Sequence, residues 1–322
     1  MGTLLTYRYS LYDVPFTADV ALALPGPPPG APIRLDIRAE PEEPPPALAA
    51  DRLDHEVIDG WMALRAYSSG RMEIEFADWL LLRIDAGGRQ VGYRVREQAY
   101  PTAFEAYIAN FALSGALLLQ GEETLHATVV DHDGRGIGLL GHSGAGKSTF
   151  AAWLLSQGGD LVTDDMLRIT ETGGAAYAEP GQPRLKLMPD AAERHFAGSA
   201  NEGAANRGRW NPVSEKYLFD TAAPAAPRRR CRLDLLVWLG APADDRPDEI
   251  ALRRLTGLEA FNVLAGSAMN TKLQTADRLA RQLRFIERVA RRVPLYELRY
   301  PRRPDVFPEL VAQLMGADRA AR

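Results

Sequence analysis

The chain of 322 residues is 46% hydrophobic and 25% charged, proportions typical of a globular protein large enough for two domains. Its formal net charge of −4 provides no broad basic field, which argues against nucleic acid as a partner. A single cysteine, Cys231, excludes an internal disulfide framework, and no apolar run approaches the roughly 20 residues that span a bilayer. We therefore expect a cytoplasmic protein without a membrane segment.

The first hundred residues carry the patterns of strands and turns. Two proline-rich stretches, PGPPPGAP at 25–32 and PEEPPP at 41–46, predict stiff loops because proline fits neither a helix interior nor a central strand. From 72 to 95, apolar residues alternate with others on both sides of an Asp-Ala-Gly-Gly turn at 85–88, which predicts a β-hairpin or meander. We predict a small β-rich domain over 1–100.

The pattern changes after residue 100. The stretch TAFEAYIANFALSGALLLQG is apolar on most sides and predicts a buried connecting helix over 101–121. Beyond it, strand patterns near 125–130, 137–141, 160–169 and 232–240 are mixed with helical patterns at 148–157 and around Leu279, Leu283, Ile286 and Val289. This mixture predicts an α/β domain over 122–322.

The sequence GHSGAGKS at 141–148 matches the phosphate-loop pattern G-x-x-x-x-G-K-[ST] at every position, between a predicted strand and a predicted helix. Glycines in such a loop let the backbone curl so that its N–H groups point at phosphate oxygens. Lys147 is expected on the β- and γ-phosphates of ATP, and Ser148 on the Mg²⁺ ion that joins them. The residues expected to bind the nucleotide are Gly141, His142, Ser143, Gly144, Ala145, Gly146, Lys147, Ser148 and Thr149. A glycine-rich turn that binds nothing is the alternative.

Two adjacent carboxylates, Asp164 and Asp165, follow the next predicted strand. In phosphate-loop proteins an acid at the end of a neighbouring strand holds the metal ion, and a second acid can accept a proton from an attacking hydroxyl. An aspartate pair by itself is equally typical of a turn or a helix start. Its position after the phosphate loop favours a catalytic role.

From Leu125 to Ile169 the chain resembles the catalytic domain of bacterial HPr kinase/phosphorylase. The resemblance is carried by His126 in LHATVV, by the phosphate loop fifteen residues later, and by Asp164-Asp165 sixteen residues past Ser148. It implies a phosphate-loop kinase domain of this type, in which the histidine strand and the loop strand form a hairpin. It also implies that His126 lies near the transferred phosphate, that Asp164 is the base on the acceptor serine, and that Asp165 helps to hold the metal ion.

HPr kinases usually carry aspartate at the position of His142, which leaves open whether this chain also catalyses the family's reverse reaction, phosphorolysis of phosphoserine. The stretch YAEPGQPRLKLMPD at 177–190 is similar to a broader group of HPr-kinase-like proteins, some of which phosphorylate lasso-peptide precursors. In this stretch Glu179, Arg184 and Lys186 either face the phosphates or belong to a solvated strand edge.

We therefore predict an ATP- and Mg²⁺-dependent serine kinase, with Asp164, His126 and Lys147 as catalytic residues and Ser148 and Asp165 as ligands of the metal ion. The acceptor is expected to be a serine of a peptide or protein, in the first place a ribosomal lasso-peptide precursor. Two other functions stay open. One is a kinase of a small metabolite, and the other is a nucleotide-dependent binding module in which ATP orders the segment 201–212. No membrane or nucleic-acid partner is expected, and the sequence leaves a homo-oligomer open.

Overall fold

The structure, a computed structural model, describes residues 5–41, 51–77, 79–96, 101–196, 208–222, 228–242 and 248–317. Two segments singled out in the sequence fall largely outside these ranges, namely the proline-rich loop at 41–46 and most of the segment at 201–212. The first proline-rich stretch, 25–32, contains neither helix nor strand, as predicted.

The N-terminal part forms an eight-stranded sheet in the order β1-β2-β3-β8-β7-β6-β5-β4. Its strands are β1 (Tyr7–Leu11), β2 (Val14–Ala18), β3 (Leu35–Ala39), β4 (Leu53–Asp59), β5 (Met62–Tyr67), β6 (Met72–Phe76), β7 (Leu80–Ile84) and β8 (Gln90–Val95). Strands β4 to β8 make an antiparallel meander, so the prediction for 72–95 is confirmed. The Asp85 carboxylate closes the β7–β8 turn by accepting from the N–H groups of Arg89 and Gln90 at 2.6 and 2.7 Å.

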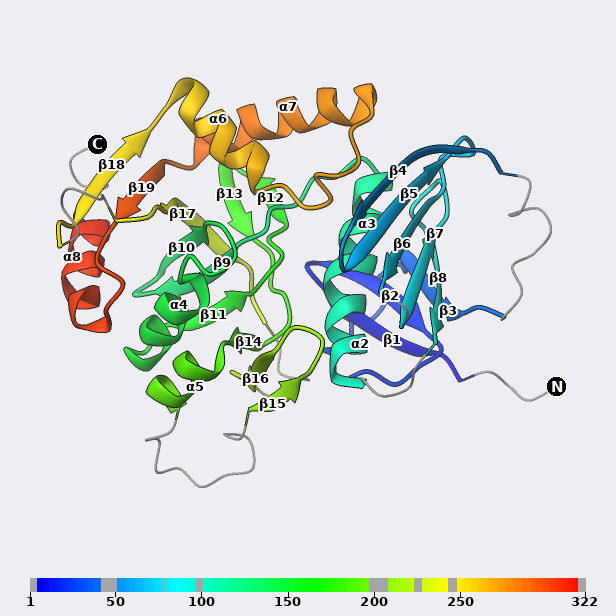
Figure 1. Ribbon diagram of the computed structural model, residues 1–322, viewed down its shortest axis with the longest axis horizontal. Coiled ribbons are helices and arrows are strands. Elements are labelled where there is room, and N and C mark those ends of the chain that lie inside the picture. The colour runs from blue at the N-terminus through cyan, green and yellow to red at the C-terminus, as the bar shows by residue number, and fades with distance from the viewer. Residues whose placement is uncertain are drawn as a thin grey trace.

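A long helical segment lies between this sheet and the rest of the chain (Figure 1). It consists of α2 (Pro101–Tyr107), a π-helical turn η1 (Ile108–Ala112) and α3 (Leu113–Leu119), so the predicted buried helix is confirmed. Contrary to the expectation from composition, Pro101–Leu119 is long and apolar enough to cross a bilayer, although 78% of its most apolar window is buried. Its apolar side chains pack against the N-terminal sheet in one hydrophobic core, and this packing accounts for the composition.

The C-terminal part is built on a second sheet in the order β11-β9-β10-β17-β13-β12, extended by β19 beside β17 and by β18 beside β19. Its strands are β9 (Thr128–His132), β10 (Arg135–Leu140), β11 (Asp160–Thr163), β12 (Ile169–Thr172), β13 (Ala175–Ala178), β17 (Cys231–Leu239), β18 (Ala251–Leu255) and β19 (Leu295–Arg299). The central strand β17 is parallel to β10 and β19. Strands β9 and β10 pair antiparallel across a tight turn, which is the hairpin that the family resemblance implies.

Helices cover both faces of this second sheet (Figure 1). Apolar residues of α4 (Lys147–Ser156) and α8 (Phe307–Ala317) pack on one face, and those of α6 (Gly257–Gly266) and α7 (Ala276–Arg292) pack on the other. A small third sheet in the order β14-β16-β15 lies beside it, formed by β14 (Arg184–Leu187), β15 (Arg209–Asn211) and β16 (Lys216–Asp220). Helix α5 (Pro189–Phe196) follows β14, and a 3-10 turn η3 (Pro304–Val306) precedes α8.

The predicted fold class, an α/β phosphate-loop domain preceded by a β-rich part, is confirmed. The domain boundaries at 100 and 121 stay a prediction.

The predicted helical pattern around Leu279, Leu283, Ile286 and Val289 lies within α7. Two of these four residues, Ile286 and Val289, are buried, whereas Leu279 and Leu283 are 46% and 55% exposed. The buried side of the helix begins with Arg278 and continues through Phe285. A pattern of apolar residues does not show this buried arginine, which is stabilised by partners outside the helix.

Candidate functional site

The loop between β10 and α4 has the backbone conformation that the phosphate-loop pattern requires. Gly141 and Gly146 have φ values of 149° and 92°, in the left-handed region that favours glycine. A side chain at Gly141 would also place its Cβ only 2.8 Å from the Cβ of Ala145. Helix α4 then begins at Lys147, and the Phe150 N–H donates to the Gly146 carbonyl at 2.9 Å. The N-terminus of α4 therefore opens into the loop, the arrangement that binds phosphate in other proteins.

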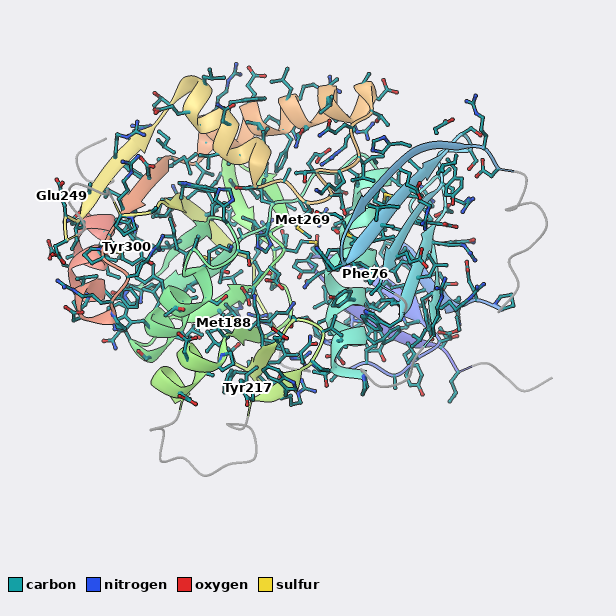
Figure 2. All side chains as sticks on the ribbon, viewed as in Figure 1. Phe76, Met188, Tyr217, Glu249, Met269 and Tyr300 are labelled. Carbon is teal, nitrogen blue, oxygen red and sulfur yellow. The ribbon has the colours of Figure 1, made fainter. Side chains whose placement is uncertain are left out.

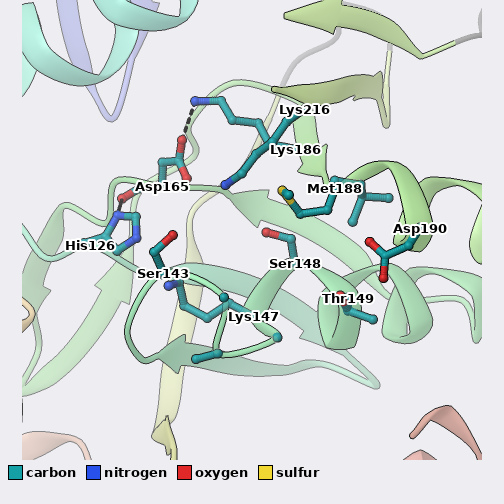
Figure 3. Close-up of a pocket in the computed structure, with 14 residues that line it drawn as sticks. His126, Ser143, Lys147, Ser148, Thr149, Asp165, Lys186, Met188, Asp190 and Lys216 are labelled. Carbon is teal, nitrogen blue, oxygen red and sulfur yellow. Dashed lines mark hydrogen bonds and ion pairs between the residues drawn. The ribbon is translucent and has the colours of Figure 1, made fainter. Parts of the chain in front are cut away.

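A cavity of about 350 Å³ lies over this loop and is called here the phosphate-loop cavity (Figure 3). It is lined by His126, Ser143, Gly144, Ala145, Gly146, Lys147, Ser148, Thr149, Asp165, Lys186, Leu187, Met188, Asp190 and Lys216. The Lys147 ammonium donates to the carbonyls of Gly141 and His142 at 2.7 and 3.2 Å, so it is held inside the loop. Burial lowers the pKa of Lys147.

Three of the predicted site residues do not line this cavity: Gly141, His142 and Asp164. Gly141 contributes its carbonyl to Lys147, as described above. The His142 ring packs edge-on against Trp238, with the ring centres 4.9 Å apart. The imidazole that stands at the family's aspartate position therefore contacts the central strand β17.

The Asp164 carboxylate is buried next to the cavity and is 6% exposed. One oxygen accepts from the Thr128 hydroxyl at 2.7 Å, and the other accepts from the Lys186 backbone N–H at 3.0 Å. Burial, followed by the charge of Asp165, raises the pKa of Asp164 to about 6. This carboxyl can therefore change its protonation state close to neutral pH.

Asp165 is the carboxylate that lines the cavity, and its backbone has a positive φ of 69°. Its side chain pairs with the Lys186 ammonium and accepts from the Asn110 amide at 3.3 Å. Burial acts to raise the pKa of Asp165, but the charge of Lys186 outweighs it and holds the pKa well below its usual range. Asp165 therefore stays ionised at neutral pH.

His126 lies just before β9 rather than within the predicted strand, because its N–H donates to the Ser267 carbonyl at 2.6 Å. Its ring Nδ1 is 2.9 Å from the Asp165 carbonyl oxygen. A carbonyl can only accept, so Nδ1 carries the proton and the lone pair of the neutral ring is on Nε2. Burial lowers the pKa of His126, which favours this neutral form. The structure thus brings His126, Lys147, Ser148 and Asp165 around one cavity.

Comparison with known proteins gives relatives that match only part of the chain. An HPr kinase/phosphorylase from an Exiguobacterium species is 37% identical over 79 residues, which are 24% of this chain and 24% of that protein. An HPr kinase/phosphorylase from Clostridium botulinum is 42% identical over 67 residues, 21% of this chain and 22% of that protein. Over about a quarter of its length, the chain is HPr kinase-like. No protein-family model matches the chain.

Among solved structures, the HPr(Ser) kinase/phosphatase from Coxiella burnetii covers 62% of this chain and 91% of its own, at 14% identity and a TM-score of 0.34. A likeness at this level does not extend the comparison beyond the quarter of the chain that matches in sequence. The matches likewise span less than a quarter of the curated relatives' own length.

This HPr kinase-like chain places two further lysines, Lys186 and Lys216, in the phosphate-loop cavity. Of its 38 basic residues only four are lysines, and three of the four, Lys147, Lys186 and Lys216, line this cavity. Lysine carries a compact charge that shifts easily between phosphate oxygens, whereas arginine makes fixed paired hydrogen bonds. The scarcity of lysine is a sequence signal that could have identified both residues. Lys216 makes no ion pair with any residue that the structure describes.

The charged side chains of the stretch 177–190 lie in two environments, one facing the cavity and one inside the protein. Lys186 faces the phosphate-loop cavity. Arg184 is buried and pairs with Glu105 at 2.5 Å and with Asp220 at 2.8 Å, while Glu179 accepts from the Thr170 hydroxyl at 2.5 Å. Of the three residues whose environment the sequence left open, only Lys186 lines the phosphate-loop cavity.

Proposed function

We propose that this protein is an ATP-dependent kinase that transfers the γ-phosphoryl group to a serine hydroxyl of a peptide or protein. The observation that carries the proposal is that the phosphate loop, His126 and the Asp165 carboxylate line a single cavity. The partial matches to proteins named HPr kinase/phosphorylase support a phosphotransferase of this kind. Following the resemblance to the broader group, we propose a ribosomal lasso-peptide precursor as the acceptor and the cytoplasm as the place of reaction.

In this proposal the phosphate-loop backbone, Lys147 and the neighbouring Lys216 hold the phosphates of ATP. Ser148 and Asp165 both line the cavity, and hydroxyl and carboxylate oxygens are the ligands that Mg²⁺ prefers, so these two residues fit the ion. When bound, Mg²⁺ neutralises charge on the phosphates. Positioning and charge neutralisation account for most of the catalysis in phosphoryl transfer, so a few well-placed groups suffice.

The transfer step forms a bond between the serine oxygen and the γ-phosphorus and breaks the bond from that phosphorus to ADP. The serine hydroxyl gives up one proton. We propose that this proton passes to Asp164, because its raised pKa lies nearer to neutral pH than that of Asp165. Asp165 then stays ionised for the metal ion, and His126 offers the Nε2 lone pair to a hydrogen-bond donor on the substrate. Because Asp164 does not line the cavity, its role requires that the acceptor hydroxyl reach the Thr128 side of the carboxylate pair.

The nucleotide-binding part of the proposal is tested with two lysine variants. Lys147→Ala is expected to abolish the rise in melting temperature on adding Mg-ATP, and with it phosphate transfer, while the fold stays intact. Lys272→Ala is the matched control, because the fourth lysine pairs with Asp59 on the surface at 2.9 Å and lines neither the loop nor its cavity. Differential scanning fluorimetry and transfer of labelled phosphate to candidate peptides are the measurements. An unchanged Mg-ATP shift in Lys147→Ala would rule out the phosphate-loop assignment.

A further inference from the structure

A second cavity of about 460 Å³ adjoins the phosphate-loop cavity. Five residues line both: His126, Ser143, Asp165, Lys186 and Lys216. The two cavities therefore meet at the carboxylate, imidazole and ammonium groups to which the proposed reaction assigns its chemistry. A molecule in the second cavity would therefore contact the same charged groups as a nucleotide in the phosphate-loop cavity.

The far wall of the second cavity comes from parts of the chain distant in sequence. The N-terminal part contributes Trp61, Tyr107, Asn110 and Phe111, and the third sheet contributes Asn211. The loop between α6 and α7 contributes Met269 and Asn270, and Met269 lies where the two halves of the molecule meet (Figure 2). This wall consists of aromatic rings, a thioether, side-chain amides and the smaller residues Val213, Ser214 and Ala268. Every charged residue that lines the second cavity is shared with the phosphate-loop cavity.

The helix irregularity next to this cavity is a second, separate observation. The π-helical turn Ile108–Ala112 interrupts the long helix at the position of Asn110 and Phe111, two residues of the cavity wall. Such turns cost helical regularity and are frequent at functional sites. Asn110 accepts from the Tyr12 hydroxyl at 3.2 Å and donates to Asp165 at 3.3 Å, so the irregular turn connects the wall to the cavity-lining carboxylate.

The aromatic part of the wall is held in place from behind. The Phe111 ring contacts Phe76 and Tyr107 at centre distances of 4.7 and 5.1 Å. Trp61, between β4 and β5, contacts Phe76 and Phe111 at 5.8 and 5.9 Å and is nevertheless 49% exposed. A large apolar side chain that is fixed on one side and open on the other is suited to contact an apolar group of a ligand.

We infer that the second cavity binds the peptide segment around the acceptor hydroxyl, with an apolar side chain of that peptide against Trp61 and Phe111. This inference rests on the proposed kinase function and adds to it the place where the acceptor binds and the kind of side chain that flanks its serine. A small charged metabolite would find no ionic partner on the far wall, because its amides and rings are neutral. A peptide backbone is also neutral, and its N–H and C=O groups match the amides of Asn110, Asn211 and Asn270, which both donate and accept. The volume lies in the range of ligand pockets and has room for one or two residues.

The inference is tested with Trp61→Ala and serine peptides that carry leucine or aspartate beside the serine. The leucine peptide is expected to be the better substrate of the natural chain. In Trp61→Ala its KM should rise about tenfold, the scale of a truncated aromatic contact, while kcat and the KM for ATP stay unchanged. Trp210→Ala is the matched control, because Trp210 is 44% exposed, contacts the Tyr217 ring with the ring centres 5.0 Å apart, and lines neither cavity.

Three outcomes overturn the inference. The first leaves the proposed function standing, the second leaves a small-molecule kinase, and the third leaves nucleotide binding alone. The first is an equal KM for the leucine peptide in Trp61→Ala and the natural chain. The second is phosphorylation of free serine or another small alcohol with no peptide accepted. The third is that no peptide is phosphorylated and none binds, although Mg-ATP still stabilises the fold. Peptide binding is measured by titration calorimetry in the presence of a non-hydrolysable ATP analogue. Loss of that Mg-ATP stabilisation in the natural chain would instead refute the proposed function itself.

Discussion

Asp164 and Asp165 are neighbours in the chain but experience opposite electrostatic surroundings. Asp164 is buried against Thr128 and near the negative charge of Asp165, so its pKa is raised. Asp165 is paired with Lys186, so its pKa is lowered. Two carboxyl groups whose pKa values are separated in this way can divide the tasks of base and metal ligand.

This division of tasks predicts different defects for the two amide variants. Asp164→Asn is expected to keep the Mg-ATP-induced rise in melting temperature and to lower phosphate transfer about 100-fold or more, the scale of a lost general base. Asp165→Asn is expected to lose the difference between stabilisation by ATP with Mg²⁺ and with EDTA. The assays are transfer of labelled phosphate and differential scanning fluorimetry. Normal transfer by Asp164→Asn, together with none by Asp165→Asn, would assign the base to Asp165.

The raised pKa of Asp164 also predicts how stability depends on pH. Between pH 3.8 and about 6 the folded state holds a proton on Asp164 that the unfolded state releases. The contribution of this carboxyl to the free energy of unfolding is therefore present at low pH and is lost as the pH rises through that window, by up to about 3 kcal/mol. Asp165 keeps its charge in this window because its pKa is lowered. Urea denaturation at pH 4, 5, 6 and 7 should show a smaller decline for Asp164→Asn than for the natural chain, and equal declines would contradict the raised pKa.

At the scale of elements, one buried arginine organises the loop that closes the second cavity. Arg278, at the start of α7, is 1% exposed and pairs with Glu123 at 3.1 Å. The same guanidinium donates to the carbonyls of Met269, Asn270 and Leu273 at 2.6 to 2.7 Å. These bonds hold the α6–α7 loop, which supplies Met269 and Asn270 to the cavity wall.

Replacing this arginine is expected to destabilise the protein strongly. Arg278→Met leaves Glu123 buried without its partner and removes the guanidinium donor from three carbonyls, which should lower the free energy of unfolding by about 3–5 kcal/mol. Arg288→Met, on the same helix, removes an exposed pair with Glu171 at 3.3 Å and should cost less than about 1 kcal/mol. Urea denaturation of both variants makes the comparison. Similar losses in the two would show that the buried network is not what fixes this loop.

At the scale of the whole molecule, the N-terminal part is joined to the phosphate-loop part by several buried contacts. Glu105 of α2 pairs with Arg184 of β14 at 2.5 Å, and the Tyr12 N–H donates to the Pro180 carbonyl at 2.8 Å. Met166 and Leu273, far along the chain, belong to the hydrophobic core of the N-terminal sheet. The second cavity is lined by residues of both parts, so its shape depends on both. Because the N-terminal part supplies Trp61 to the cavity wall, a change in this part is expected to affect acceptor binding at the phosphate-loop part.

Local sequence patterns predicted much of the fold and the backbone conformation of the phosphate loop. The glycines and Lys147 of the phosphate loop could be read directly, because left-handed backbone and a short fixed spacing are local requirements. The meander and the long helix could be predicted from the sequence, because alternating and continuously apolar residues are patterns of neighbouring positions in the chain. The burial of Arg278 could not be predicted from local patterns, because its partner Glu123 is 155 residues away in the chain.

The amino-acid sequence by itself therefore determined the α/β class, the phosphate loop and the order of histidine, loop and carboxylate pair. Only the tertiary structure decided that Asp165 rather than Asp164 lines the cavity, that Lys186 and Lys216 join it, and that Trp61 and Phe111 wall the space beside it. The reason is physical. Backbone conformation and periodicity depend on neighbours in the chain, whereas burial, pKa and the lining of a cavity depend on residues that folding brings together from a distance.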